Sequence, residues 1–157
     1  MALTLQAPSG DVTSPGVAEL VFTLGYEGRD VGALATRLRE AQVTRVLDVR
    51  ASARSARPGF SRGPLCRALE RAGFEYRHLP EAGNPFRAEA ASDLAGALAR
   101  FRAHLEGHPE IVSTVVAAVA GVRAALLCAE ANPARCHRSV LAQALAVSRP
   151  GMTVVHL

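Results

Sequence analysis

The sequence predicts a single-domain α/β fold, a mostly parallel sheet of about five strands with helices on both faces. Short apolar runs of strand length alternate with longer segments whose apolar residues recur at helical spacing. The 157 residues suit one domain of ordinary size, and neither an internal repeat nor a second-domain boundary interrupts this order. Residues 1–18 carry Ser, Pro, Gly and Thr without periodicity, so we expect a flexible N-terminal tail before a domain spanning residues 19–157.

The first half of the domain contains three predicted strands and two predicted helices. The strands are expected at residues 20–24, 45–49 and 74–79. The third alternates with period two, which is typical of a strand near the sheet edge. Asp30 is expected to cap the first helix, whereas Pro64 and Gly73 are expected to begin and end the second. Between them, residues 51–63 are rich in Arg and Ser and are predicted to form a long loop.

The second half contains three predicted helices and two predicted strands. After a loop through Pro80 and Pro85, Ser92 is expected to cap a helix, and Pro109 to start another. A fourth strand is expected at residues 123–127, with a helix after Pro133 and a last strand at residues 153–157. Strands that alternate with helices in this way favour a parallel sheet covered on both faces.

Composition excludes several classes of protein. Hydrophobic residues make up 49% and charged residues 20%, which argues against disorder, and no apolar run reaches the ~18 residues of a membrane span. All 18 basic residues are Arg, so there is no lysine for a Schiff base or a Walker-type phosphate clamp. The start of the chain has no signal-peptide pattern, and three cysteines make a poor disulfide framework. We therefore expect a cytoplasmic protein that does not associate with membranes and keeps its thiols reduced.

Reactive side chains concentrate just after the predicted strands. In open α/β sheets, ligands bind beyond the carboxyl ends of the strands. Residues of this kind at or after these ends are, in chain order, Tyr26, Asp48, Arg50, Arg54, His78, Glu81, Cys128, Glu130, Cys136, His137 and Arg138. Loops are polar in any protein, but this concentration favours a real site at one edge of the sheet.

The most specific segment runs from Cys128 to Arg138. A strand ends at a thiol, turns through Asn132 and Pro133, and enters a helix near Arg135. A helix N-terminus and a nearby guanidinium lower the pKa of a thiol, which makes Cys128 a candidate nucleophile. The same geometry binds phosphate without covalent chemistry, and a buried structural thiol is the third alternative. The segment resembles the thiol loop of phosphatases and rhodaneses, but it reads Cys-x6-Arg and lacks their glycines, which counts against a phosphatase.

Other roles for these residues stay open. Cys128, Cys136 and His137 are possible metal ligands, or the two cysteines a reversible disulfide, but no Cys-x2-Cys pair exists and we predict no metal site. Asp48 and Arg50 share one face of a strand, which suits either an ion pair or acid–base catalysis by Asp48.

Several motifs together resemble the family called domain of unknown function 488. They are Thr23-Leu24-Gly25-Tyr26-Glu27-Gly28, Asp48-Val49-Arg50, Arg57-Pro58-Gly59-Phe60, His78-Leu79-Pro80 and Cys128-Ala129-Glu130 with Cys136-His137-Arg138. The resemblance spans about Val21 to Ala146 and implies a small α/β domain. It implies a site rather than a reaction, and it adds Phe60 to the residues singled out above. Glu81-Ala82-Gly83 departs from the family pattern, in which Leu-Gly follows the acidic residue.

These observations favour an enzyme that acts on a phosphate-bearing ligand, such as a nucleotide or a nucleic-acid component. Cys128, Glu130, Asp48 and His137 are the candidate catalytic residues. The candidate ligand-binding residues are Tyr26, Arg50, Arg54, Phe60, His78, Glu81, Cys136 and Arg138. The alternatives are a non-catalytic module that binds a nucleotide or nucleic acid, and a Cys/His metal or thiol-redox protein. The sequence does not identify a cofactor or an oligomeric state.

Overall fold

A computed structural model describes residues 19–157 and shows a five-stranded sheet in which all strand pairs are parallel. The strands are β1 (Glu19–Gly25), β2 (Arg45–Asp48), β3 (Glu75–His78), β4 (Ala124–Cys128) and β5 (Met152–His156). Their order in the sheet is β3-β2-β4-β1-β5, so the most central strand, β4, brings Cys128 between β1 and β2. The predicted α/β fold is confirmed, including the position of β3 at an edge.

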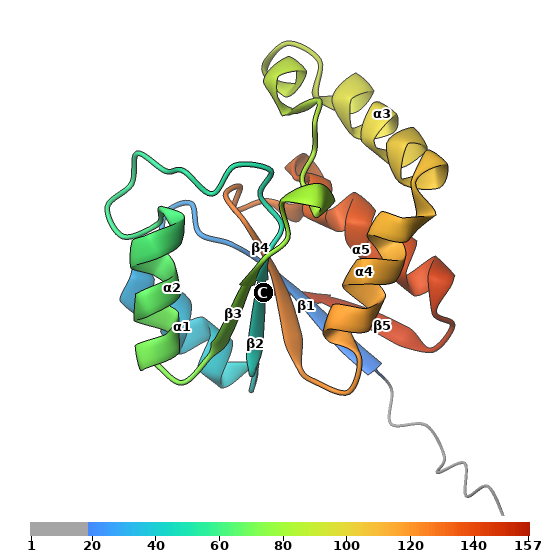
Figure 1. Cartoon of the computed structure of the whole chain (residues 1–157). Helices are drawn as coiled ribbons and strands as arrows, with labels where there is room; N and C mark the ends of the chain where they lie inside the picture. Colours follow the sequence, from blue (N-terminus) through green and yellow to red (C-terminus); the bar gives the residue numbers. More distant parts are fainter. Residues whose placement is uncertain (1–18) are drawn as a thin grey trace, which may run out of the picture.

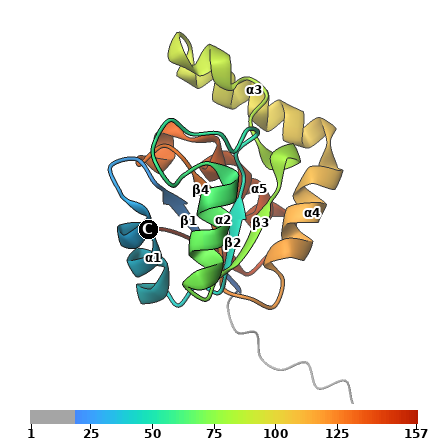
Figure 2. The same ribbon diagram turned by 60° about the vertical axis from the view of Figure 1, so that its left-hand side comes forward.

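Helices cover both faces of the sheet (Figure 1). They are α1 (Val31–Glu40), α2 (Arg62–Arg71), α3 (Leu94–Gly107), α4 (Pro109–Val119) and α5 (His137–Ser148). The helices α1 and α2 lie on one face, and α4 and α5 lie on the other, with α3 packed beside them. The view in Figure 2, turned by 60°, brings α1 and α2 forward in front of the sheet.

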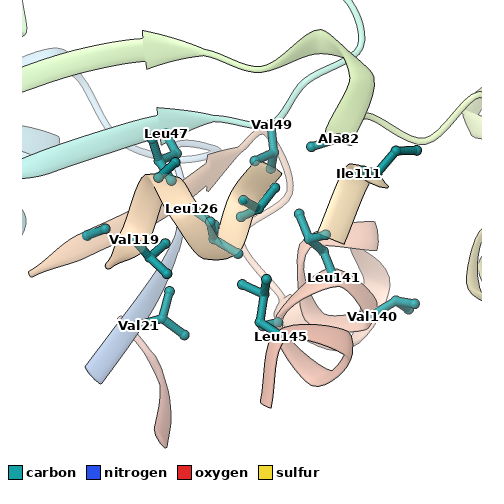
Figure 3. Close-up of a cluster of buried hydrophobic side chains, with 14 of the residues drawn as sticks. Val21, Leu47, Val49, Ala82, Ile111, Val119, Leu126, Val140, Leu141 and Leu145 are labelled. Carbon is teal, nitrogen blue, oxygen red and sulfur yellow. The ribbon is translucent and has the colours of Figure 1, made fainter. Parts of the chain in front are cut away.

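Two hydrophobic cores follow from this arrangement. Side chains alternate between the faces of a strand, so β4 sends Leu126 into one core and Leu127 into the other, and both are fully buried. In the core shown in Figure 3, Leu126 packs with Val21 and Leu47 of neighbouring strands and with residues of α4 and α5, such as Leu141. A strand buried on both faces reads as a continuous apolar run, which is why β4 was predictable from the sequence.

The helix starts agree with the sequence patterns in part. Asp30 caps α1 as predicted, because its carboxylate accepts a hydrogen bond from the backbone N–H of Ala33 at 2.7 Å. The prediction that Ser92 caps α3 is wrong: Asp93 accepts from the N–H of Gly96 at 2.8 Å. After Pro133 the chain forms only a 3-10 turn, Pro133–Arg135, and α5 begins at His137.

The predicted tail, residues 1–18, lies outside the described residues. None of the helices within residues 19–157 has the length and apolar composition of a membrane span.

Candidate functional site

The carboxyl ends of the strands bring distant parts of the chain together above the sheet, where the loops after β1, β2 and β4 gather in Figure 1. The register pairs Gly25 of β1 with Cys128 of β4. A Cβ atom on Gly25 would lie 1.8 Å from the backbone carbonyl oxygen of Glu130, so only glycine allows the loop after β4 to cross here. This crossing holds Glu130 close to the ends of β1 and β4.

Three reactive side chains form a buried group that we call the Cys–His cluster, namely Cys128, Cys136 and His137, which are 2%, 1% and 6% exposed. The Nδ1 atom of His137 lies 3.7 Å from Sγ of Cys128 and 3.9 Å from Sγ of Cys136. The three ligand atoms all lie within 4.8 Å of one another. The structure therefore brings together three side chains that the sequence separates by up to nine positions.

Hydrogen bonding fixes the ring of His137. Its Nε2 atom lies 2.8 Å from the carbonyl oxygen of Val49, at the end of β2. A carbonyl oxygen only accepts hydrogen bonds, so Nε2 carries a proton, and Nδ1 is the ring nitrogen that faces the two sulfur atoms. The edge of the Phe101 ring packs against the imidazole at 5.3 Å between centroids.

The two thiols of the cluster have opposite pKa shifts. The interaction with Cys128 lowers the pKa of Cys136 to about 5; burial opposes this shift, and His137 and Arg138 favour it. The same interaction with Cys136, together with burial, raises the pKa of Cys128 well above its ordinary value. The geometry therefore does not favour the lowered pKa predicted for Cys128. Cys136, and not Cys128, is the N-cap residue of α5.

Glu130 joins the Cys–His cluster to the surface. Its Oε2 atom accepts a hydrogen bond from Sγ of Cys128 at 3.3 Å, and its Oε1 atom lies 3.7 Å from the guanidinium of Arg87. Burial acts to raise the pKa of Glu130, but its interactions with Cys136, with its own backbone and with Cys128 outweigh burial, so the pKa of the carboxyl is lowered. Glu130 is thus an ionised carboxylate at neutral pH.

A cavity of about 260 Å³ lies beside Glu130. Its wall includes two carboxylates and two guanidinium groups, and its lining residues are Tyr26, Glu27, Ser55, Ala56, Arg57, Arg87, Ala129 and Glu130. We call it the site cavity. It contains two of the predicted site residues, Tyr26 and Glu130, and it is accessible from solvent through its exposed rim residues Arg57 and Arg87.

Asp48 and Arg50 form a separate buried group, which we call the Asp48–Arg50 network. Arg50 donates from Nε to Oδ1 of Asp48 at 2.8 Å, and Tyr76 donates from its hydroxyl to Oδ2 at 2.6 Å. The remaining donors of Arg50 reach the Tyr26 hydroxyl and the carbonyl oxygen of Phe60. Burial opposes the charge of Arg50, but these partners raise its pKa further above its ordinary value. Of the two roles weighed for Asp48, this geometry favours the ion pair.

The other predicted ligand-binding residues occupy varied positions. The Phe60 ring is buried and stacks on Tyr26, with centroids 4.3 Å apart. Arg138 is also buried, and its guanidinium donates to the backbone carbonyls of Glu130 and Ala131. His78 contacts the carbonyl oxygen of Arg50 at 2.8 Å. Arg54 and Glu81 are exposed, and neither lines the site cavity.

Two cavity residues that reasoning from the sequence did not select are Glu27 and Arg87. Glu27 belongs to the Gly-Tyr-Glu-Gly motif, and its carboxylate accepts a hydrogen bond from the N–H of Ala131 at 3.0 Å. Arg87 follows β3 by nine positions, in a 3-10 turn of residues Arg87–Ala91. No pattern near Arg87 distinguishes it from a surface arginine, so only the folded chain reveals its place at the cavity.

The comparison with protein families supports the resemblance seen in the motifs. Residues 30–145 match the family model described as domain of unknown function DUF488. The chain belongs to the DUF488 family. The DUF488 match contains every predicted site residue except Tyr26, which precedes it. No curated protein and no solved structure matches the chain.

Proposed function

We propose that this DUF488 protein is an enzyme that acts on a small phosphate-bearing ligand, such as a nucleotide or a nucleic-acid component, bound in the site cavity. One observation carries the proposal. Glu130 lines an open cavity, and its Oε2 atom contacts Cys128 in the buried cluster. A carboxylate between an accessible cavity and buried reactive groups is placed to move a proton to or from a bound ligand.

The charges around the cavity favour this class of ligand. Arg57 and Arg87 are exposed guanidinium groups on the rim, and guanidinium groups bind phosphate with two parallel hydrogen bonds. Arg50 and Arg138 were expected to hold the anion, but their donors already have partners within the protein. Arg57 donates to the carbonyl oxygen of Arg29 and Arg87 lies near the Glu130 carboxylate, but both guanidinium groups are exposed, so we assign the anion-binding role to them.

The two carboxylates of the cavity further restrict the range of ligands that fit it. Glu27 and Glu130 accept hydrogen bonds and repel a second anionic group. A ligand that is anionic at one end and rich in hydroxyl or amino donors at the other would pair with both the guanidinium groups and the carboxylates of the cavity. Nucleotides and sugar phosphates have this character, which supports them over inorganic polyanions.

A thermal-shift screen tests the binding part of the proposal. Nucleoside monophosphates and sugar phosphates are compared with the corresponding nucleosides and sugars, and stabilisation should require the phosphate. In an Arg57→Gln/Arg87→Gln variant the dissociation constant should rise by about tenfold or more for each lost charge-assisted contact. The matched control is Arg67→Gln/Arg71→Gln, which removes the same charge from the exposed face of α2.

Turnover tests the catalytic part. The stabilising compound is incubated with the protein and its products are measured. Glu130→Gln should keep binding within a few-fold and lose about 10²-fold or more of the rate, because loss of a positioned acid–base group has that effect. Binding without turnover would favour the non-catalytic binding module instead. If no phosphate-bearing compound stabilises the chain, or if both arginine variants bind equally well, the proposal fails.

A further inference from the structure

We propose that Cys128, Cys136 and His137 bind one zinc ion. This inference goes beyond the proposed function, because it concerns a buried metal site and stands whichever ligand the site cavity takes. It also departs from the expectation drawn from the sequence, which contained no Cys-x2-Cys spacing and predicted no metal.

The first argument is the spacing of the ligand atoms. With Zn–S bonds near 2.3 Å and Zn–N bonds near 2.0 Å, a tetrahedral zinc holds its sulfur and nitrogen ligands about 3.5 Å apart. The Nδ1 atom of His137 lies 3.7 Å from the sulfur of Cys128 and 3.9 Å from that of Cys136. The two nitrogen-to-sulfur distances therefore lie within a few tenths of an ångström of those in a tetrahedral site.

The second argument is the orientation of the imidazole. A histidine that binds a metal through one nitrogen usually donates its other N–H to a carbonyl or carboxylate, which fixes the tautomer. Nε2 of His137 makes this contact with the carbonyl oxygen of Val49 at 2.8 Å. The lone pair of Nδ1 is thereby directed to the side where both thiols lie.

The third argument is charge balance in a buried place. Zinc binding deprotonates both thiols, and the two positive charges of the ion neutralise the two thiolates, which are costly to bury alone. Arg138, whose side chain is also buried, supplies positive charge beside Cys136. Thiolate and imidazole ligands in tetrahedral geometry favour zinc over magnesium, calcium or manganese, which prefer oxygen.

Three protein ligands leave the fourth position for water or for a carboxylate. Glu130 is the nearest candidate, because its Oε2 atom lies 3.3 Å from Sγ of Cys128. Sites with three protein ligands and an open position are typical of catalytic zinc, whereas structural sites have four. A catalytic role for the metal rests on the proposed function, but the presence of the metal does not.

Metal analysis of the full chain tests the inference. Inductively coupled plasma mass spectrometry of protein purified without chelators should find one zinc per chain. The fully reduced, metal-free chain should bind one Zn²⁺, and with Co²⁺ it should show the visible bands of a tetrahedral ion and a sulfur-to-cobalt charge-transfer band. X-ray absorption of the zinc form should give two sulfur ligands for each zinc.

Variants separate the site from adventitious binding. Cys136→Ser and His137→Gln should each weaken zinc binding by at least about 100-fold, since losing a ligand costs more affinity than losing a residue that only hydrogen-bonds to a ligand. Cys66→Ser is the matched control, because Cys66 lies on α2 outside the cluster, and this variant should bind like the wild type. Circular dichroism establishes that each variant is folded, and the wild-type measurements decide the matter if one is not.

Two results would overturn the inference. One is a folded, reduced wild-type chain that binds no zinc at micromolar metal. The other is bound zinc without sulfur ligands, or zinc that Cys136→Ser and Cys66→Ser retain equally. In the first case a thiol or disulfide pair replaces the metal site. Phosphate-dependent thermal shifts of the metal-free chain are measured in parallel, so failure of the zinc site is distinguishable from failure of the proposed function.

Discussion

The Asp48–Arg50 network and the Cys–His cluster lie at the same edge of the sheet, yet their polar groups are paired in different ways. In the network, both carboxylate oxygens of Asp48 accept hydrogen bonds from Arg50 or Tyr76, and the guanidinium of Arg50 has partners on all three nitrogens. In the cluster, Nδ1 of His137 faces two sulfur atoms at 3.7 and 3.9 Å, and sulfur is a weak hydrogen-bond partner.

This difference separates two ways to use buried polar residues. A network whose donors and acceptors are all paired inside the protein has little left to offer a ligand, so its effect is on stability and shape. A cluster in which an imidazole nitrogen contacts only sulfur atoms can still bind a metal or a substrate. Sequence proximity to a strand end does not distinguish the two, because Asp48 and Cys128 end neighbouring strands.

The largest expected effect is in the network. Arg50→Met removes one partner of a buried ion pair and leaves the Asp48 carboxylate uncompensated, which should cost about 3–5 kcal/mol of unfolding free energy. Urea denaturation measures the change. The double variant Asp48→Leu/Arg50→Met should recover much of the loss, because two apolar side chains replace the whole pair. A single variant as stable as the wild type would show that the network is not structural.

A second change tests the close approach between Gly25 of β1 and the backbone of Glu130 in the loop after β4. Gly25→Ala places a Cβ against the carbonyl of Glu130 and should cost about 1–3 kcal/mol, because backbone atoms must move apart. It should also weaken phosphate-dependent stabilisation, since Glu130 shifts. Gly107→Ala at the end of α3 is the control: its Cβ meets no atom within 4 Å, so stability and ligand binding should stay close to wild type. Equal behaviour of the two variants would contradict the role of Gly25.

Substitution in the Cys–His cluster should affect zinc binding and activity more than stability, the reverse of what is expected for the Asp48–Arg50 network. In the metal-free chain, Cys136→Ala should cost about 1–2 kcal/mol of unfolding free energy, less than Arg50→Met, because it removes one buried atom and leaves no buried ion pair broken. The same variant should lose zinc binding and any turnover. Denaturation of the metal-free protein, compared with metal content and activity, checks this. A loss as large as that of Arg50→Met would remove the contrast between the two regions.

The smallest effect is expected at the ion pair between Arg45 of β2 and Glu75 of β3. The side chain of Glu75 is 44% exposed. Hydrogen bonds from Arg45 and Arg77 lower the pKa of Glu75 below its ordinary value of 4.5. Its stabilising contribution is therefore present above about pH 4.5 and is lost as the pH falls through the lower pKa of the folded chain.

Solvent screening keeps this contribution below about 1 kcal/mol. Comparison of Glu75→Gln with the wild type by urea denaturation should show the difference at pH 6 and a smaller one near pH 3. The difference should also shrink in high salt. A larger difference at low pH than at pH 6 would reverse the assigned sign.

Much of the fold was predictable from the sequence. Apolar periodicity identified all five strands, because burial on one or both faces of a sheet leaves a regular pattern in the chain. The same patterns placed the candidate site at the carboxyl edge. They could not fix the start of α5, because a 3-10 turn after Pro133 shifts the first helical residue to His137. That shift decides which cysteine lies at the helix N-terminus.

The sequence by itself therefore determined the fold class and the set of reactive side chains at one edge of the sheet. Only the tertiary structure decided which of them meet. His137 is oriented by a carbonyl at the end of β2, and Glu130 reaches Arg87 from a different loop. Such contacts join residues dozens of positions apart. They depend on strand order and loop paths, which leave no local pattern in the sequence.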